Sequence, residues 1–155
     1  MRRGTKTIGV ISDTHGLVRR EALAALRGCD AIVHAGDIGK QEVLEQLADL
    51  APLTAIRGNV DKWATDLQDT AVLTLGGKRF YVIHDVNELE LDPRSAGFAA
   101  VISGHSHVPK SEMREGVLYL NPGSAGPKRF KLPVAVARIC VGKDGVDAEL
   151  VVLPV

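Results

Sequence analysis

The stretch Thr7-Ile-Gly-Val-Ile-Ser-Asp-Thr-His15 (TIGVISDTH) joins an apolar run to an acidic residue and a histidine. A short apolar run rich in β-branched residues indicates a strand that is buried on both faces. Further strands of this kind are expected at Asp30–His34 (DAIVH) and Leu53–Ile56. Apolar residues at helical spacing fill the two intervals, over residues 19–27 and 40–50. This strand–helix alternation predicts right-handed crossovers and a largely parallel sheet.

The second half of the sequence differs, because strands predominate after residue 70. Turn signals separate three pairs of strand-like segments, and each signal favours a hairpin. The turns are expected at Gly76-Gly77, Glu115-Gly116 and Lys143-Asp-Gly145, with another buried strand at Ala99–Ser103. The two halves together predict an α/β fold in which two mixed β-sheets pack as a sandwich flanked by helices. The sequence contains no repeat or linker, which predicts one domain over residues 1–155.

The composition is typical of a soluble globular protein. Hydrophobic residues make up 45% of the 155 residues, and 19 basic residues balance 19 acidic ones, so the formal net charge is zero. A neutral chain argues against bulk capture of long nucleic acid. We find no signal peptide and no apolar run that could cross a membrane, and we therefore expect a cytoplasmic protein. Cys29 and Cys140 are expected to be reduced, buried thiols.

Polar side chains follow five of the predicted strands at the point where each strand ends. They are Asp13 and His15, Asp37, Asn59 and Asp61, His84, and His105 and His107. In open α/β sheets, sites lie outside the carboxyl ends of the strands, so these side chains are expected to converge. Each group alone has an ordinary reading as a turn, a cap or a surface residue. The joint pattern argues against chance, because four of the five histidines belong to it.

Imidazole, carboxylate and amide groups suit divalent ions of borderline to hard character. We expect Mn²⁺ first, with Ni²⁺, Fe²⁺ and Zn²⁺ as alternatives. The set offers more ligands than one ion with open positions can use, so two ions that share a carboxylate are expected. The fifth histidine, His34, lies within a predicted strand. We interpret it as a buried residue near the site rather than as a ligand.

The order of these motifs resembles the signature of the calcineurin-like metallophosphoesterase superfamily. The motifs are Asp13-Thr-His15, Gly36-Asp37, Gly58-Asn59-Val-Asp61, His84 and Gly104-His105-Ser-His107. The short length and the run Asn121-Pro-Gly-Ser124 resemble its compact bacterial and archaeal phosphodiesterase branch, which has an α/β sandwich fold. The resemblance assigns one metal ion to Asp13, His15 and His107. It assigns the second ion to Asn59, His84 and His105, with Asp37 bridging both.

The resemblance also implies an activity. The expected function is hydrolysis of a P–O bond, most directly in a small phosphodiester, by a hydroxide that bridges the two ions. Asn59 would help to orient the phosphate, and Arg57 is a candidate substrate contact, unless it is solvated or salt-bridged. Asp61 is expected to brace the Asn59 loop. A possible anion-attracting rim consists of Lys128, Arg129 and Lys131, for which a solvated loop is the alternative.

Two positions depart from the family pattern. Many members have a histidine after the Gly-Asn pair, where it protonates the leaving oxygen, whereas this chain has Val60. A glycine commonly follows the ligand His84, whereas Asp85 and the acidic segment 87–90 follow here.

Three questions stay open at this stage. One alternative function is a non-catalytic scaffold subunit, as in the retromer coat. Another is a phosphomonoesterase or nucleotidase that uses the same site. A homo-oligomer is also left open, because compact relatives often self-associate.

Overall fold

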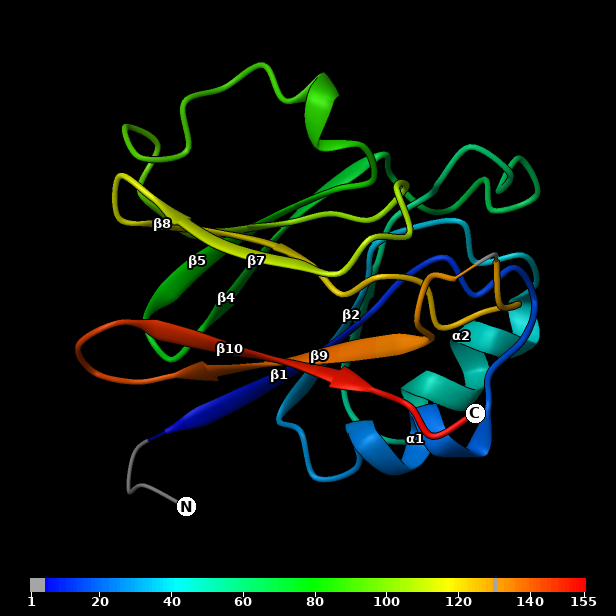
Figure 1. Ribbon diagram of the computed structural model, residues 1–155. Coiled ribbons are helices and arrows are strands. Elements are labelled where there is room, and N and C mark those ends of the chain that lie inside the picture. Colours follow the sequence, from blue (N-terminus) through cyan, green and yellow to red (C-terminus); the bar gives the residue numbers. More distant parts are fainter. Residues whose placement is uncertain (1–4, 130) are drawn as a thin grey trace.

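The computed structural model describes residues 5–129 and 131–155, whose strands form two five-stranded sheets (Figure 1). The first sheet has the order β10-β9-β1-β2-β3 and consists of β1 (Lys6–Ile11), β2 (Ala31–His34), β3 (Leu53–Ala55), β9 (Ala135–Val141) and β10 (Val146–Val152). The second has the order β4-β5-β6-β8-β7 and consists of β4 (Thr70–Leu75), β5 (Lys78–Ile83), β6 (Phe98–Ile102), β7 (Lys110–Arg114) and β8 (Val117–Asn121). The predicted sandwich of two mixed sheets is confirmed.

Two layers of apolar side chains hold the sheets and helices together. The layer between the sheets includes Val10 from the first sheet and Phe80 from the second, both fully buried. Helices α1 (Arg20–Leu26) and α2 (Gln41–Ala48) cover the outer face of the first sheet, where Leu26 and Leu47 are buried in the second layer. A side chain at Gly9 would collide with Leu26, since its Cβ would lie 2.7 Å from a Leu26 methyl carbon. The glycine in the first strand therefore lets α1 pack closely.

The parallel strands place all the candidate site residues at one end of the sandwich. Strands β1, β2 and β3 run parallel to one another in the first sheet, as do β5, β6 and β8 in the second. The loops that leave their carboxyl ends gather at the right of Figure 1, on the side away from the N-terminus. The two sheets thus bring together loops that are far apart in sequence, as the hydrogen bond from the His105 N–H to Asp13, 92 residues away, shows.

Some features of the fold were not predicted. The C-terminal hairpin β9–β10 joins the first sheet, where β9 pairs antiparallel with β1. A 3-10 helix, η1 (Val86–Glu88), follows β5, and Asp85 caps it by accepting the N–H of Asn87 at 3.0 Å. No helix in the described ranges is long and apolar enough to span a membrane.

One expectation about the cysteines is wrong. Both thiols are free and Cys29 is buried, but Cys140 is exposed. Side chains alternate along β9, so Val136, Arg138 and Cys140 share the face that α1 covers. Val136 is buried there, and Arg138 donates a hydrogen bond to the Ala25 carbonyl oxygen of α1. Helix α1 does not extend over Cys140, which is therefore exposed.

Candidate metal centre

Backbone strain in this protein is concentrated at the predicted ligands. Six residues other than glycine have a positive φ in the described ranges. Five of them are Asp13 (55°), His15 (47°), Asp37 (57°), His105 (71°) and His107 (65°). A left-handed backbone is uncommon for such residues and persists where the surrounding structure enforces it, often at functional sites. These loops leave their strands in strained conformations that turn the ligand candidates toward one another.

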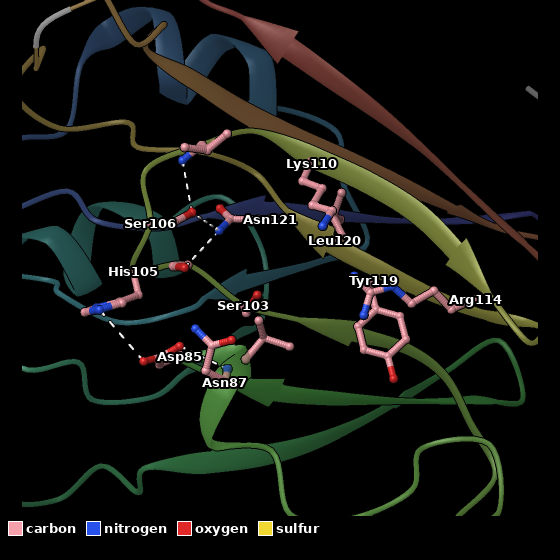
Figure 2. A pocket seen from close by; sticks show the side chains of 13 residues that line it. Asp85, Asn87, Ser103, His105, Ser106, Lys110, Arg114, Tyr119, Leu120 and Asn121 are labelled. Carbon is pink, nitrogen blue, oxygen red and sulfur yellow. Dashed lines mark hydrogen bonds and ion pairs between the residues drawn. The ribbon is translucent and has the colours of Figure 1, made fainter.

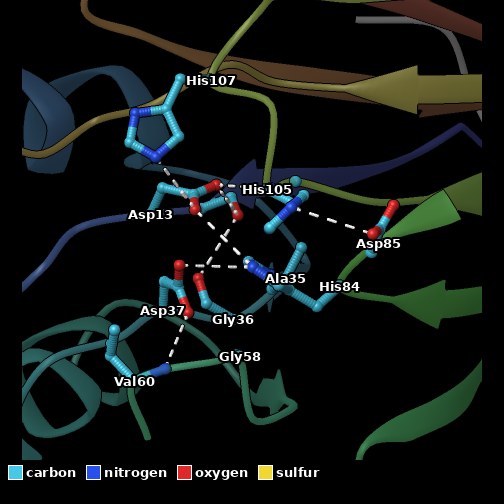
Figure 3. A network of polar contacts seen from close by, with 12 residues as sticks. Asp13, Ala35, Gly36, Asp37, Gly58, Val60, His84, Asp85, His105 and His107 are labelled. Atoms are coloured by element: carbon cyan, nitrogen blue, oxygen red, sulfur yellow. Dashed lines mark hydrogen bonds and ion pairs between the residues drawn. The ribbon is translucent and has the colours of Figure 1, made fainter. Parts of the chain in front are cut away.

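Two overlapping groups of side chains have donor atoms close enough to share an ion. Asp13, His15 and His107 form one group, and Asp13, Asp37 and His84 form the other, with the donor atoms of each group within 4.8 Å of one another. Figure 3 shows Asp13, Asp37, His84 and His107 gathered where loops from the two sheets meet. The Asp37 Oδ2 atom lies 3.8 Å from His15 Nε2 and 3.3 Å from His84 Nε2. Asp37 therefore stands between the histidines that were assigned to different ions.

Several donor atoms in this cluster are buried and make no hydrogen bond within the described ranges. They are Asp13 Oδ1, His15 Nε2 and His84 Nε2. A buried polar atom without a partner costs about 1–3 kcal/mol, so three in one place call for a common partner. Carboxylate oxygen and imidazole nitrogen are the donors that a divalent transition-metal ion requires. The residues therefore fit a metal centre.

Hydrogen bonds from neighbouring groups orient two of the candidate ligands, His84 and Asp13, toward the cluster. The Nδ1–H of His84 donates to the Ala35 carbonyl oxygen at 2.7 Å, which leaves the lone pair of Nε2 free. The Oδ2 atom of Asp13 accepts hydrogen bonds from the Ser12 hydroxyl at 2.7 Å and from the His105 N–H at 3.0 Å. Its Oδ1 atom stays available. Hydrogen bonds of this kind fix the tautomer and the direction of metal ligands.

Burial and the neighbouring charged groups shift the pKa values of the clustered aspartates and histidines. Burial raises the pKa of Asp13 and lowers the pKa of His107. Burial alone would raise the pKa of Asp37, but His84 and the Val60 N–H hold it below its usual range. Burial likewise disfavours the charged form of His84, but Asp37, the Ala35 carbonyl and Asp13 raise the pKa of His84 to about 8. A metal ion that binds His84 at neutral pH must therefore displace a proton.

His34 is buried near the ligand cluster, as predicted. It is fully buried, its Nδ1 atom accepts the Gly36 N–H at 3.1 Å, and its Nε2 atom lies 2.9 Å from the Thr14 hydroxyl oxygen. The Thr14 hydroxyl donates to the Ile38 carbonyl oxygen, so the His34 Nε2–H is the donor in this pair. Burial lowers the pKa of His34 to about 3. Both ring nitrogens are occupied, and His34 supports the Asp13 and Asp37 loops from behind.

Asp61 braces the loops as expected, and this leads to a prediction about stability. Its buried carboxylate accepts the N–H groups of Ile38 at 3.0 Å, Gly39 at 3.0 Å and Gly58 at 2.8 Å. Asp61→Asn would turn an NH₂ group toward at least one of these donors. We expect the free energy of unfolding to fall by about 2 kcal/mol. Urea denaturation, with the exposed Asp66→Asn as the matched control, would measure it. An unchanged midpoint would show that the brace contributes nothing.

The remaining predicted residues lie at the edge of the cluster. Asn59 is exposed and lines a hollow of about 660 Å³ together with His84 and Arg57. The ring of His105 is 5.2 Å from that of His84, but His105 Nε2 is turned toward Asp85 at 3.8 Å and belongs to neither ligand group. Arg57 forms a salt bridge with Asp69, whose carboxylate lies 3.1 Å from Arg57 Nη2. This is the salt-bridged alternative to a substrate contact.

Sequence reasoning missed the residues that position the His105 loop. The Asn121 Nδ2 atom donates to the Gly104 carbonyl oxygen at 2.8 Å and to the Ser106 hydroxyl at 3.0 Å. A side chain at Gly104 would collide with Ser12 and with Asp13, whose Oδ2 atom would lie 2.6 Å from the new Cβ. Both Asn121 and Ser12 are polar residues at the ends of apolar strands. That same signal identified the ligand candidates.

The fold and this donor set define a metal-binding α/β sandwich protein. The family model of the calcineurin-like phosphoesterase superfamily domain matches residues 7–144. The chain therefore belongs to this superfamily, whose members are dinuclear metal-dependent phosphoesterases.

Three comparisons illustrate the relationship. A probable metallophosphoesterase of Methanocaldococcus jannaschii is 33% identical over 159 residues, which cover 96% of this chain and 82% of that protein. A phosphodiesterase of the same organism is 26% identical over 136 residues, which cover 75% of this chain and 82% of that protein. The crystal structure of Chaetomium thermophilum Vps29 has a TM-score of 0.75 at 16% identity and covers 96% of this chain and 100% of that chain. At this identity the likeness to Vps29 concerns the fold alone.

Proposed function

We propose that this chain is a metal-dependent phosphodiesterase that acts on a small phosphoester in the cytoplasm. It would use two divalent ions, for which Mn²⁺ is our first choice. The observation that carries the proposal is the set of unpartnered donor atoms on Asp13, His15 and His84, with His107 Nε2 lying 3.3 Å from Asp13 Oδ1. Membership of the superfamily and the relative that is named a phosphodiesterase support it. When bound, the ions would lower the pKa of water and neutralise charge on the phosphoryl group.

The candidate ligands divide between the two ions as follows. Asp13, His15 and His107 would hold one ion, and Asn59, His84 and His105 would hold the other. Asp37 would be shared by both ions, which its place between His15 and His84 supports. His105 must turn from Asp85 to reach its ion, because its Nε2 atom faces that carboxylate.

Two groups at the edge of the site would act on the phosphate. The exposed amide of Asn59 orients it at the mouth of the centre. The positive charge of Arg129 is close enough to lower the pKa of His107, although burial has the larger effect. Arg129 and the neighbouring exposed Lys128 therefore attract an anion toward this side.

Metal content and hydrolysis together test this function. After Mn²⁺ loading and removal of excess ion, we expect close to two ions per chain. Hydrolysis of bis(p-nitrophenyl) phosphate should disappear with a chelator and return with Mn²⁺, because the ions generate the nucleophile. A folded protein that retains no metal would refute the proposal.

The same assay separates the two alternative functions. Metal binding without turnover of any ester would favour the non-catalytic scaffold. Faster cleavage of p-nitrophenyl phosphate than of the diester would favour a phosphomonoesterase.

A further inference from the structure

A second hollow, of about 200 Å³, adjoins the metal centre on the outer face of the second sheet. It lies between η1 and strands β7 and β8, and it begins at His105 (Figure 2). Its apolar wall comes from Val86, Val108 and Tyr119, and the amide-bearing Asn87 also lines it. A mostly apolar hollow with a few polar groups is the usual form of a small-molecule site. Its volume is below the range of about 300–1,000 Å³ for whole ligands, so it suits one ring system.

The two hollows beside the metal centre differ in chemistry. The hollow at Asn59 is lined by Asp69, Asp85, Glu88 and Glu90, and its arginine, Arg57, is paired with Asp69. Placing an uncharged ring there would strip water from carboxylates, which is costly. The hollow at Tyr119 contains a single carboxylate, Asp85, at the border that it shares with the first. A ring is therefore better accommodated beside Tyr119.

Tyr119 is held in place as a stacking surface. The guanidinium carbon of Arg114 lies 4.7 Å from the centre of its ring, and Arg114 is itself fixed by Glu112 at 3.0 Å. In Figure 2 the ring stands between Arg114 and Asn87. An aromatic ring and a guanidinium plane are common stacking partners of a flat heterocycle, and a side-chain amide can pair with its edge.

The distance between Tyr119 and the metal centre also limits the ligand. Asn121 is hydrogen-bonded to the residues on both sides of His105, so it marks the end of the hollow next to the metal centre. Tyr119 precedes Asn121 by two residues on β8, which places it about 6–7 Å further from the metal centre than Asn121 is. A ring on Tyr119 must therefore be joined to a phosphate at the metal centre by a spacer of at least this length, and the sugar of a nucleotide is such a spacer.

We propose that the hollow at Tyr119 binds a nucleobase carried on the phosphoester, so that the substrates are small nucleotide esters. This inference rests on the proposed function, since it places the phosphate at the metal centre. The base stacks on Tyr119 and Asn87 contacts its edge, while Arg114 keeps the tyrosine in position.

Adenosine monophosphate and ribose 5-phosphate differ only in the base and provide a direct test. Calorimetry on the Mn²⁺-loaded protein should show at least about tenfold tighter binding of adenosine monophosphate, within the range for base–aromatic stacking. Tyr119→Ala should remove this preference and leave ribose 5-phosphate binding unchanged, whereas Tyr119→Phe should retain it. Asn87→Ala, at an exposed position, should lower it several-fold without affecting folding. The matched control is Tyr81→Ala, because Tyr81 packs against Phe98 outside the hollow.

Equal binding of the two phosphates by the wild-type protein would overturn the inference. So would a preference that survives both Tyr119→Ala and Asn87→Ala. Turnover of methyl p-nitrophenyl phosphate, which has no base, reports on the proposed function separately. If that ester is cleaved but the base has no effect on binding, only the role of the hollow fails. If that ester is not cleaved, the proposed function fails, and the calorimetric comparison still decides the role of the hollow.

Discussion

Asp37→Asn is expected to abolish metal-dependent hydrolysis, with a loss in kcat of more than about 10³-fold. This loss is larger than the loss in kcat that follows removal of one hydrogen-bond donor that stabilises transition-state charge. The reason is the position of Asp37 between the two groups of histidines, with Oδ2 3.8 Å from His15 Nε2 and 3.3 Å from His84 Nε2. Asparagine has nearly the same shape but carries no charge and offers one oxygen. The variant should also retain fewer metal ions per chain, which metal analysis would show alongside the loss of turnover.

His34 provides the matched control for this prediction. His34→Asn keeps an acceptor near the Gly36 N–H, and His34→Gln keeps a donor near the Thr14 hydroxyl, so each variant retains one of the two contacts. We expect losses of about 10–100-fold, the range for residues that orient ligands, with metal content unchanged. Losses equal to that of Asp37→Asn in folded protein would mean that His34 has been misassigned.

Val60→His is expected to accelerate the cleavage of alkyl esters by up to about 10²–10⁴-fold, the usual contribution of general acid catalysis. A leaving alkoxide needs a proton, whereas nitrophenolate leaves readily as an anion. The Val60 side chain is 49% exposed, and its N–H donates to Asp37 Oδ1 at 3.2 Å. An imidazole at this position therefore begins beside the Asp37 carboxylate and displaces no core residue.

The measurement is the ratio of kcat/KM for a nitrophenyl diester and a matched alkyl diester. The wild-type protein should strongly prefer the aryl ester, and Val60→His should narrow the gap. Lys62→His, which adds the same group at an exposed position in the same loop, should leave the ratio unchanged. Equal cleavage of both esters by the wild type would reveal a proton donor other than residue 60. His84 and His105 are poor candidates for that donor, because their lone pairs are committed to metal in the proposed site.

Local patterns in the sequence were sufficient to predict most of the strands and the polar residues that follow them. The run Thr7–Ser12 is apolar because β1 is covered on one face by the second sheet and on the other by α1. Asp13 and His15 follow it because a parallel strand must leave the sheet at its carboxyl end, where loops converge. These relations involve residues close together in the chain, and the sequence displays them directly. The predicted places of His34 and Asp61 followed from the same reasoning.

Contacts between distant segments were decided only by the tertiary structure. The sequence does not show that Asp69 binds Arg57, that Asp85 faces His105, or that β9 pairs with β1. It also does not show that Tyr119, Asn87 and His105 line one hollow, because they come from three different segments. Strand patterning reports which faces of an element are buried but not which element covers them. The choice of partner element depends on packing the whole sandwich, and it determines the chemistry around the candidate ligands that the sequence had already indicated.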